Sequence, residues 1–167
     1  MLLEVYAKIK DFEQYAISNY GEVINITTGI KKKQSTNENG YKKVDLYLNG
    51  KRKSIFVHRL VGNAFIDKIN EKTLIDHKDC NKTNNRLDNL RWCNNSENMR
   101  NSKISSRNNS GVRGVSFDKE KQKWKAVITV NGKIMHIGYF EDLEVAKIAR
   151  QDKSKEIFGE FLHSCEK

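Results

Sequence analysis

Apolar and polar positions alternate with a period of two over several short stretches, a pattern that predicts strands joined by tight turns. Within residues 4–30, an apolar segment at residues 5–9 precedes two short strands separated by an Asn19-Tyr20-Gly21 turn, where glycine is free to adopt a positive φ. The spacing changes within residues 57–66, where apolar side chains recur every three or four positions and predict a short helix. No stretch approaches the roughly 18 apolar residues that a membrane-spanning helix needs, so we expect no membrane partner.

The period-two pattern is clearest between residues 31 and 57, where Val44, Leu46 and Leu48 alternate with polar neighbours. Asn49-Gly50 is a strong signal for a hairpin turn, so we expect a two-stranded ribbon there. Lysines on one face of such a ribbon would contact phosphates, whereas the alternative is an ordinary solvated strand face. The basic side chains concerned are Lys31, Lys32, Lys33, Lys51, Arg52 and Lys53.

A polar stretch rich in small residues, at residues 102–110, predicts a linker to a separate C-terminal unit. Period-two runs in this unit predict three strands, at residues 114–118, 124–130 and 133–140. A helix is expected from Glu141-Asp142 to Phe158. Small alanines on this helix allow it to lie close on one face of the sheet, which leaves the other face for a partner.

The charge of the chain narrows the class of partner. The net charge is +10, and residues 31–60 contain nine lysines and arginines against two acidic residues, a local balance of +7. A concentrated basic patch favours a polyanion, most often nucleic acid, over the alternative of a merely basic surface. The hydrophobic content of 37% and the charged content of 31% are typical of small domains with thin cores.

Cysteine usage and the N-terminal residues indicate the compartment. The three cysteines are odd in number, widely spaced and without a C-x-x-C pair, so we expect neither a disulfide framework nor a structural zinc site. The N-terminal stretch lacks the basic start and apolar run of a secretory signal. We therefore expect an intracellular protein in a reducing compartment. Abundant Asn, Lys and Ile without proline suggest an AT-rich viral or phage genome.

Residues 76–101 carry the chemistry that the rest of the chain serves. Hydrolysis of a phosphodiester needs an activated water, a cation beside the phosphate and relief of charge on the leaving oxygen. His77 is the candidate general base, since histidine serves most often in this role. Asp76 and the side-chain oxygen of Asn98 are candidate ligands of Mg²⁺, with Mn²⁺ as a substitute. Asn89 can hydrogen-bond the loop backbone and hold the base in orientation, while His58 could reach a phosphate, cap or pack.

The string DHKDCNKTNNRLDNLRW, with the helix-borne Asn98 behind it, resembles the HNH nucleases, which have the ββα-metal fold. Val57-His58-Arg59-Leu60 is similar to the lead-in segment of HNH homing endonucleases. The resemblance implies metal-dependent cleavage of DNA that leaves a 5′-phosphate. It also implies roles for His77 as general base, for Asp76 and Asn98 as metal ligands, and for Asn89 as the structural middle residue. Asn in place of His at the third signature position is the H-N-N pattern of phage-intron nicking enzymes.

Two flanking segments resemble modules that accompany such nucleases. YAISNYGEV, which begins at Tyr15, is similar to the core of NUMOD-type modules. Residues 113–115, 124–126 and 137–140 resemble the DNA-binding domain of plant ethylene-response factors, whose three-stranded sheet enters the major groove. By that resemblance the side chains facing DNA are Arg113, Ser116, Lys125, Thr129 and His136. In the nuclease segment the further candidate DNA contacts are His58, Arg59 and Arg91.

The predicted fold is α+β, with a small β-rich NUMOD-type module at residues 1–56 and a ββα-metal nuclease at residues 57–101. After the linker at residues 102–110, residues 111–167 form a three-stranded antiparallel sheet packed on one helix. The predicted function is a DNA endonuclease of the HNH homing type, which binds double-stranded DNA as a monomer or weak dimer and nicks one strand per monomer. The alternative is a sequence-specific DNA-binding regulator with an inactive nuclease fold. An RNA-binding protein is a weaker alternative, because the aromatic residues do not form a base-stacking platform.

Overall fold

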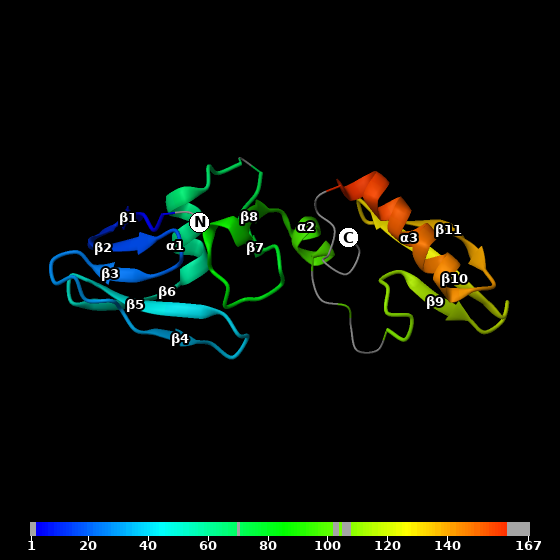
Figure 1. Cartoon of the computed structure of the whole chain (residues 1–167), viewed down its shortest axis with the longest axis horizontal. Coiled ribbons are helices and arrows are strands. Elements are labelled where there is room, and N and C mark those ends of the chain that lie inside the picture. The colour runs from blue at the N-terminus through cyan, green and yellow to red at the C-terminus, as the bar shows by residue number, and fades with distance from the viewer. Residues whose placement is uncertain (1–2, 70, 102–103, 105–107, 160–167) are drawn as a thin grey trace. The chain divides into compact units, whose positions relative to one another are not determined.

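The computed structural model describes residues 3–69, 71–101, 104 and 108–159 (Figure 1). Contacts within the chain divide it into two compact units, residues 1–94 and residues 95–167, which are described separately. Cys165 and parts of the predicted linker, residues 102–103 and 105–107, lie outside the described residues. In the described ranges, no helix is both long and apolar enough to cross a membrane.

The described strands of the first unit form small antiparallel sheets. One sheet contains, in this order, β1 (Tyr6–Ile9), β2 (Phe12–Ser18) and β3 (Val23–Asn25). A second sheet contains β4 (Gln34–Thr36), β5 (Lys42–Leu48) and β6 (Lys51–Phe56), and a ribbon pairs β7 (Leu74–His77) with β8 (Leu90–Cys93). Helix α1 (Val57–Phe65) follows β6 directly, and the short 3-10 helix η1 (Leu87–Asn89) precedes β8.

The N-terminal sheets follow the predicted alternation, with one addition. Asn19-Tyr20-Gly21 forms the turn between β2 and β3, and Gly21 has a φ of +86°. The predicted two-stranded ribbon is three-stranded, because β4 pairs with β5 through partners such as Gln34 and Val44. The sequence of β4 is polar and short, so nothing in its own pattern marks it as a strand. Its pairing depends on the open edge that β5 offers.

Among the basic residues of β6, the two lysines share one face of the sheet and Arg52 lies on the other. Lys53 is paired with the buried Leu46, so Lys51 and Lys53 emerge on the same face as the core residues of β5. Arg52 emerges on the other face, where it forms an ion pair with Asp45 at 3.7 Å. Strand alternation explains the result, since three consecutive basic residues must point to both faces of a sheet.

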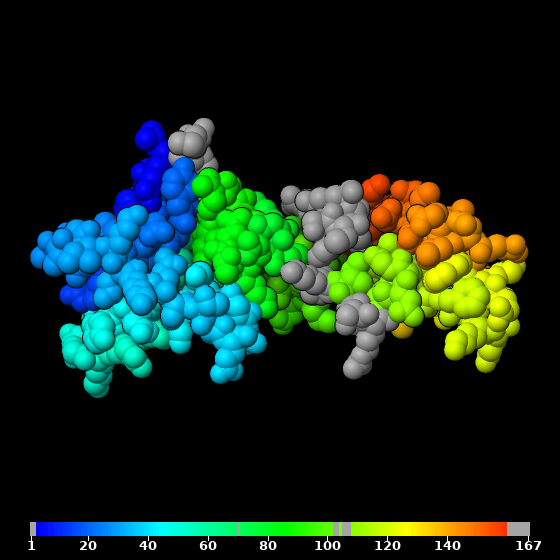
Figure 2. Space-filling model, turned by 60° about the horizontal axis from the view of Figure 1, so that its bottom comes forward, coloured from blue at the N-terminus to red at the C-terminus, as the bar shows by residue number. Residues whose placement is uncertain are grey.

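One hydrophobic core joins the N-terminal sheets, α1 and the ribbon of β7 and β8. Its buried members come from β1, β2, β3, β5, α1 and β8, and include Ile17, Val23, Leu46, Val57, Val61 and Leu90. Ile75 of β7 and Leu87 of η1 pack against this core. In Figure 2, the blue-to-cyan surface of residues 3–56 accordingly meets the green surface of the following segment without a gap. The predicted module boundary after residue 56 therefore falls within one core.

The second unit begins with α2 (Asn95–Arg100) and contains the predicted three-stranded sheet on one helix (Figure 1). The strands are β9 (Val115–Asp118), β10 (Lys123–Val130) and β11 (Lys133–Phe140), in the order β11-β10-β9, and the helix is α3 (Leu143–Phe158). Ala126 of β10 and Ala146 of α3 are both fully buried in the core between helix and sheet. Small side chains thus let the helix lie close to the sheet, as the sequence predicts.

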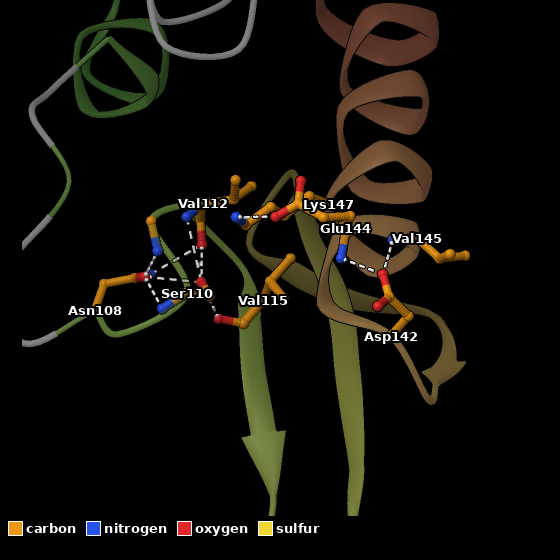
Figure 3. Close-up of polar contacts among 9 residues, drawn as sticks. Asn108, Ser110, Val112, Val115, Asp142, Glu144, Val145 and Lys147 are labelled. Carbon is orange, nitrogen blue, oxygen red and sulfur yellow. Dashed lines mark hydrogen bonds and ion pairs between the residues drawn. The ribbon is translucent and has the colours of Figure 1, made fainter.

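Polar side chains fix the starts of β9 and α3 (Figure 3). The carboxylate of Asp142 caps α3 by accepting hydrogen bonds from two backbone N–H groups of its first turn, at 2.7 and 3.1 Å. Before β9, the buried hydroxyl of Ser110 lies 2.9 Å from the carbonyl oxygen of Val112 and 2.7 Å from that of Val115. The side chain of Asn108 accepts from the backbone N–H of Ser110 at 3.0 Å. These bonds replace the partners that the ends of regular elements lack.

Gly114 provides a test of the close packing between the start of β9 and strand β10, with Gly111 as its matched control. The two glycines have φ values of +76° and +74°, but a Cβ on Gly114 would lie 2.2 Å from the carbonyl oxygen of Val127, whereas one on Gly111 meets nothing within 4 Å. Both alanine variants carry a strain of about 1 kcal/mol. We expect Gly114→Ala to cost the second unit at least about 3 kcal/mol, because β10 must also move. Hydrogen exchange of the β9 and β10 amides measures both losses, and equal losses would contradict the close approach.

Candidate active site

His77 is held by a side chain from the loop that follows it. The ring is 4% exposed at the end of β7, and its Nε2 lies 3.0 Å from Oδ1 of Asn85, which is 5% exposed. The amide nitrogen of Asn85 donates to the carbonyl oxygen of Thr83 at 3.4 Å, which turns the amide oxygen toward the ring. Because an amide oxygen can only accept, Nε2 of His77 carries the proton and the lone pair lies on Nδ1.

Asn89 fastens the loop between β7 and β8. Its side-chain oxygen accepts from the backbone N–H of Asp79 at 3.1 Å, and its amide nitrogen donates to the carbonyl oxygen of Asn84 at 2.8 Å. This is the loop-bonding geometry expected of Asn89, and its catalytic consequence stays a prediction. The side chain that bonds the base is instead Asn85, which sequence reasoning did not select. In a string containing so many asparagines, the sequence gives no signal for the one that bonds His77.

Asp79 belongs to the same loop, and its carboxylate bonds other residues of this loop. Its carboxylate accepts from the side chains of Asn84 and Asn89 at 2.7 and 2.9 Å, and from the backbone N–H of Asn81 at 2.8 Å. Burial by itself would raise the pKa of Asp79, but these hydrogen bonds outweigh it and hold the pKa below its usual value. The carboxylate therefore stays charged and fixes the loop that contains Asn85.

Asp76 forms an ion pair across the ribbon with Arg91. The two residues are direct partners on β7 and β8, and Nε and Nη2 of Arg91 lie 3.0 and 2.9 Å from the same carboxylate oxygen. The exposed fractions of the two side chains are 8% for Asp76 and 15% for Arg91. Asp76 and His77 point to opposite sides of the ribbon, as neighbours on a strand must. A site that uses both therefore lies at the end of β7.

His58 is buried beside the base. Its ring is 7% exposed, lies 5.2 Å from the ring of His77 between centroids, and stacks on Phe56 at 5.5 Å. Burial, with the nearby His77 and Arg59, lowers the pKa of His58 to about 3, so the ring is neutral at neutral pH. Among the described residues, its Nδ1 has no hydrogen-bond partner. The ring of His58 thus packs on Phe56 and His77, and its contact with a phosphate stays a prediction.

The other basic candidates of the first unit lie at the surface. The exposed ones are Lys31, Lys33, Lys51, Arg52, Lys53 and Arg59. Lys32 is half-buried, with its ammonium 5.7 and 5.8 Å from the ring centres of Tyr15 and Tyr47. Lys53 and Arg59 line an open groove of about 850 Å³, to which Lys10 and Lys68 also contribute. Sequence reasoning missed these two lysines, because neither lies within the basic stretch of residues 31–60.

The sheet of the second unit collects four predicted DNA contacts on one face. Lys125 is paired with Ser116, and Val127 is paired with His136, so these side chains and Thr129 alternate with the buried Ala126 and Ile128. They lie on the face opposite α3. Arg113 lies in the loop before β9, where its guanidinium donates to the carbonyl oxygen of Met99 at 2.6 Å. Whether this face contacts DNA stays a prediction.

The donor chemistry of the candidate ligands Asp76 and Asn98 fits a hard cation. Asp76 supplies a carboxylate at the end of β7, and Asn98 is exposed on α2 in the second unit. Within the described ranges, no group of three or more His, Cys, Asp or Glu side chains is placed to hold a metal. One carboxylate with an amide oxygen suits Mg²⁺, which keeps several waters and binds substrate phosphates as further ligands. The pairing of Asp76 with Asn98 at one ion stays a prediction.

Comparisons with known proteins identify the family. Residues 56–100 match the family described as HNH endonuclease, and residues 4–47 match the NUMOD4 motif. Protein 3.8 of Escherichia phage T7 is 37% identical over 87 residues, which are 52% of this chain and 71% of that protein. The chain belongs to the HNH endonuclease family.

Two relatives of this HNH family member are phage proteins that are named as endonucleases. DNA endonuclease I-HmuI of Bacillus phage SP01 is 44% identical over 85 residues, which are 50% of this chain and 49% of the relative. H-N-H endonuclease F-TflII of Escherichia phage T5 is 38% identical over 92 residues, which are 54% and 48% of the two chains. The chain thus spans about half the length of these two relatives.

A solved structure extends the likeness beyond the matched segments. It is described as DNA binding and cleavage by the HNH homing endonuclease I-HmuI, and it resembles this chain with a TM-score of 0.56 and 29% identity. The likeness covers 93% of this chain and 83% of that one. HNH nucleases generally depend on a divalent metal ion.

The Asp76–Arg91 pair predicts a large loss of stability on truncation. Arg91→Ala leaves a carboxylate that is 8% exposed without its guanidinium partner, so we expect a cost of about 3 kcal/mol in the free energy of unfolding. The control is Arg52→Ala, whose pair with Asp45 is longer and whose side chain is 66% exposed, with an expected cost of at most about 1 kcal/mol. Urea unfolding followed by Trp92 fluorescence in a Trp124→Phe background compares them. A smaller loss for Arg91→Ala than for Arg52→Ala would refute the buried pair.

Because the buried ring of His58 is neutral, we expect the free energy of unfolding to depend on pH. The ring stays neutral in the folded chain down to a pKa of about 3, whereas the unfolded chain takes up a proton as the pH falls below 6.5. Stability should therefore fall between pH 6.5 and pH 4.5, with a slope of at most about 1.4 kcal/mol per pH unit. Asp79 acts in the same direction but below about pH 4. Urea unfolding at several pH values should show a flatter profile for His58→Phe, and an unchanged slope would contradict the neutral buried ring.

Proposed function

We propose that this chain is a DNA endonuclease of the HNH homing type, which hydrolyses phosphodiester bonds in double-stranded DNA. The observation that carries the proposal is the His77–Asn85 hydrogen bond beside Asp76. A histidine whose proton is fixed on one ring nitrogen is prepared to accept a proton on the other. The family match over residues 56–100 and the named activities of the phage relatives support this assignment.

His77 acts as the general base in this proposal. Nδ1 takes a proton from the water that attacks phosphorus, while Asn85 keeps the Nε2 proton in place and so stabilises the charged ring that results. Asn89 and Asp79 hold the loop so that Asn85 keeps its position. The neutral His58 beside the base excludes water without adding a competing charge.

Asp76 and Asn98 are the proposed ligands of the metal ion, with Mg²⁺ favoured by their oxygen donors and Mn²⁺ as a substitute. When bound, the ion supplies charge relief to the scissile phosphate and the leaving 3′-oxygen. Asp76 must exchange its guanidinium partner to serve in this way, which gives Arg91 a second proposed role as a phosphate contact. Because each chain has one such site, we propose that each monomer nicks one strand. The chain is proposed to be a monomer or a weak dimer.

The basic surfaces of both units are proposed to position DNA, mostly through phosphates. In the first unit these are the lysines and arginines of β6 and of residues 31–33, together with Arg59. In the second unit they are Arg113 and the sheet face of Ser116, Lys125, Thr129 and His136, which resembles the DNA-binding sheet of ethylene-response factors. The proposed modules are residues 1–56, 57–101 and 111–167, joined by the linker at residues 102–110.

A DNA-binding regulator with an inactive nuclease fold is the second candidate. The observation that favours it is the Asp76–Arg91 ion pair, because a guanidinium then occupies the carboxylate that a metal would need. The two candidates share every basic surface and differ only in whether DNA is cut.

A nicking assay on supercoiled plasmid DNA separates the two candidates. With Mg²⁺ we expect the wild-type chain to convert the plasmid to open circles, and with EDTA we expect no conversion. His77→Ala should lower the rate at least about 100-fold, since general-base catalysis is typically worth that much, while DNA affinity in a gel-shift assay stays within about twofold.

Three outcomes would change the assignment. An undiminished rate in His77→Ala would remove His77 as the base. Binding without cleavage, over a range of cations and AT-rich targets, would favour the regulator. Direct linearisation would replace the nicking monomer by a dimer or by paired cuts.

A further inference from the structure

The turn between β2 and β3 lies directly against the loop that holds the base. Its three successive residues contact three successive loop residues in reverse order. The carbonyl oxygen of Asn19 accepts from the backbone N–H of Leu87 at 2.8 Å, and the ring of Tyr20 lies 4.2 Å from the guanidinium carbon of Arg86. Gly21 packs on Asn85.

Gly21 lies so close to Asn85 that a side chain on Gly21 would press on it. A Cβ on Gly21 would lie 3.0 Å from Cβ of Asn85, 3.3 Å from its carbonyl oxygen and 3.4 Å from Cγ1 of Val57. Asn85 is the residue whose amide oxygen accepts from Nε2 of His77. A single layer of contacts therefore leads from the turn backbone to the ring of the base.

The turn is itself fixed on both sides. The hydroxyl of Ser18, which is fully buried, accepts from the backbone N–H groups of Tyr20 and Glu22 at 3.2 and 3.0 Å. The side chain of Asn19 accepts from the backbone N–H of Val5 at 3.0 Å and donates to the carbonyl oxygen of Leu3 at 2.9 Å. These bonds connect the turn to the chain before β1 and leave it little freedom to adjust to the loop.

We propose that the turn of residues 18–21 is a positioning element for the catalytic base, which acts by holding Asn85 against His77. The expected effect of the turn on the cleavage rate rests on the proposed endonuclease function. It assigns a catalytic duty to the N-terminal module in addition to any contact with DNA. The basic residues proposed for DNA in this module lie on residues 31–33 and β6, outside the turn.

Asn85 has room to move when the turn pushes on it. Beside it lies a pocket of about 350 Å³, lined by Tyr20, Gly21, Lys32 and Thr83 among others. A Cβ on Gly21 can therefore displace the Asn85 side chain toward this space while the core stays intact. The consequence is a misplaced amide oxygen, and the Nε2–H of His77 loses its acceptor.

Gly21→Ala tests the proposal, with Gly29→Ala as its matched control. Gly29 has a φ of +69° in another turn of the same module, and a Cβ there meets nothing within 4 Å. Both variants carry positive-φ strain, but only Gly21→Ala reaches Asn85. In single-turnover cleavage by the full chain with Mg²⁺, we expect Gly21→Ala to be at least about 10-fold slower and Gly29→Ala to stay within about twofold, with DNA affinity unchanged in both. Equal losses in the two variants would overturn the proposal.

An NMR measurement tests the hydrogen bond between His77 and Asn85 without any cleavage. Nitrogen-15 spectra distinguish the two neutral tautomers of each imidazole, and His77→Gln identifies the signals of His77 among the four histidines. We expect the Nε2–H tautomer in the wild type, a mixture in Gly21→Ala and Asn85→Ala, and recovery of Nε2–H in Asn85→Asp, which keeps an acceptor oxygen. An unchanged tautomer in Gly21→Ala would overturn the proposal. A wild type that never cuts would remove the proposed function and leave this measurement valid.

Ser18→Ala covers the case in which Gly21→Ala does not fold. It removes only the buried hydroxyl that braces the turn, and its control is Thr28→Ala, whose hydroxyl accepts from the backbone N–H of Ile30 at 3.4 Å in an exposed turn. We expect Ser18→Ala to slow cleavage at least about threefold and to mix the His77 tautomers, while Thr28→Ala changes neither. No effect of Ser18→Ala on either measurement would count against the turn.

Discussion

Apolar side chains from the N-terminal strands and from α1 form one core, on which the nuclease ribbon depends. Strands β7 and β8 are four residues each, and a two-stranded ribbon of this size is marginal in water. Ile75, Leu87 and Leu90 reach the core that Ile17, Leu46 and Val57 build. The ribbon that bears Asp76 and His77 therefore obtains its rigidity from residues far away in sequence.

The packing of the ribbon against the N-terminal sheets also determines the orientation of His77. His77, the candidate base, donates a hydrogen bond to Asn85, Asn85 rests on Gly21, and Gly21 belongs to a turn between strands of the first sheet. Next to the candidate base, the ring of His58 is kept uncharged by burial beside Phe56 and Tyr41. A ring held in one tautomer needs little rearrangement to accept a proton.

Much of the positive charge of the chain lies on exposed surfaces. Lysines and arginines of β6 and of residues 31–33 are mostly exposed, and alternation along β6 directs its basic residues to both faces of the sheet. In the second unit the polar sheet face is free of α3, which packs on the other face. These exposed basic surfaces stand beside a buried His77.

The sequence by itself determined the elements and the candidate reacting groups. Period-two alternation located β2, β5 and β10, asparagine–glycine pairs located two hairpin turns, and the Asp76-His77 string located the candidate base and its carboxylate neighbour. These features depend on residues close in sequence, so local pattern carries them. Tertiary structure alone decided that β4 joins a sheet, that Arg91 pairs with Asp76, and that His58 is buried. It also decided that Asn85 holds the base and that Gly21 holds Asn85. Each of these contacts joins segments whose approach is set by the shared core, and burial of one asparagine among many leaves no mark in a one-dimensional pattern.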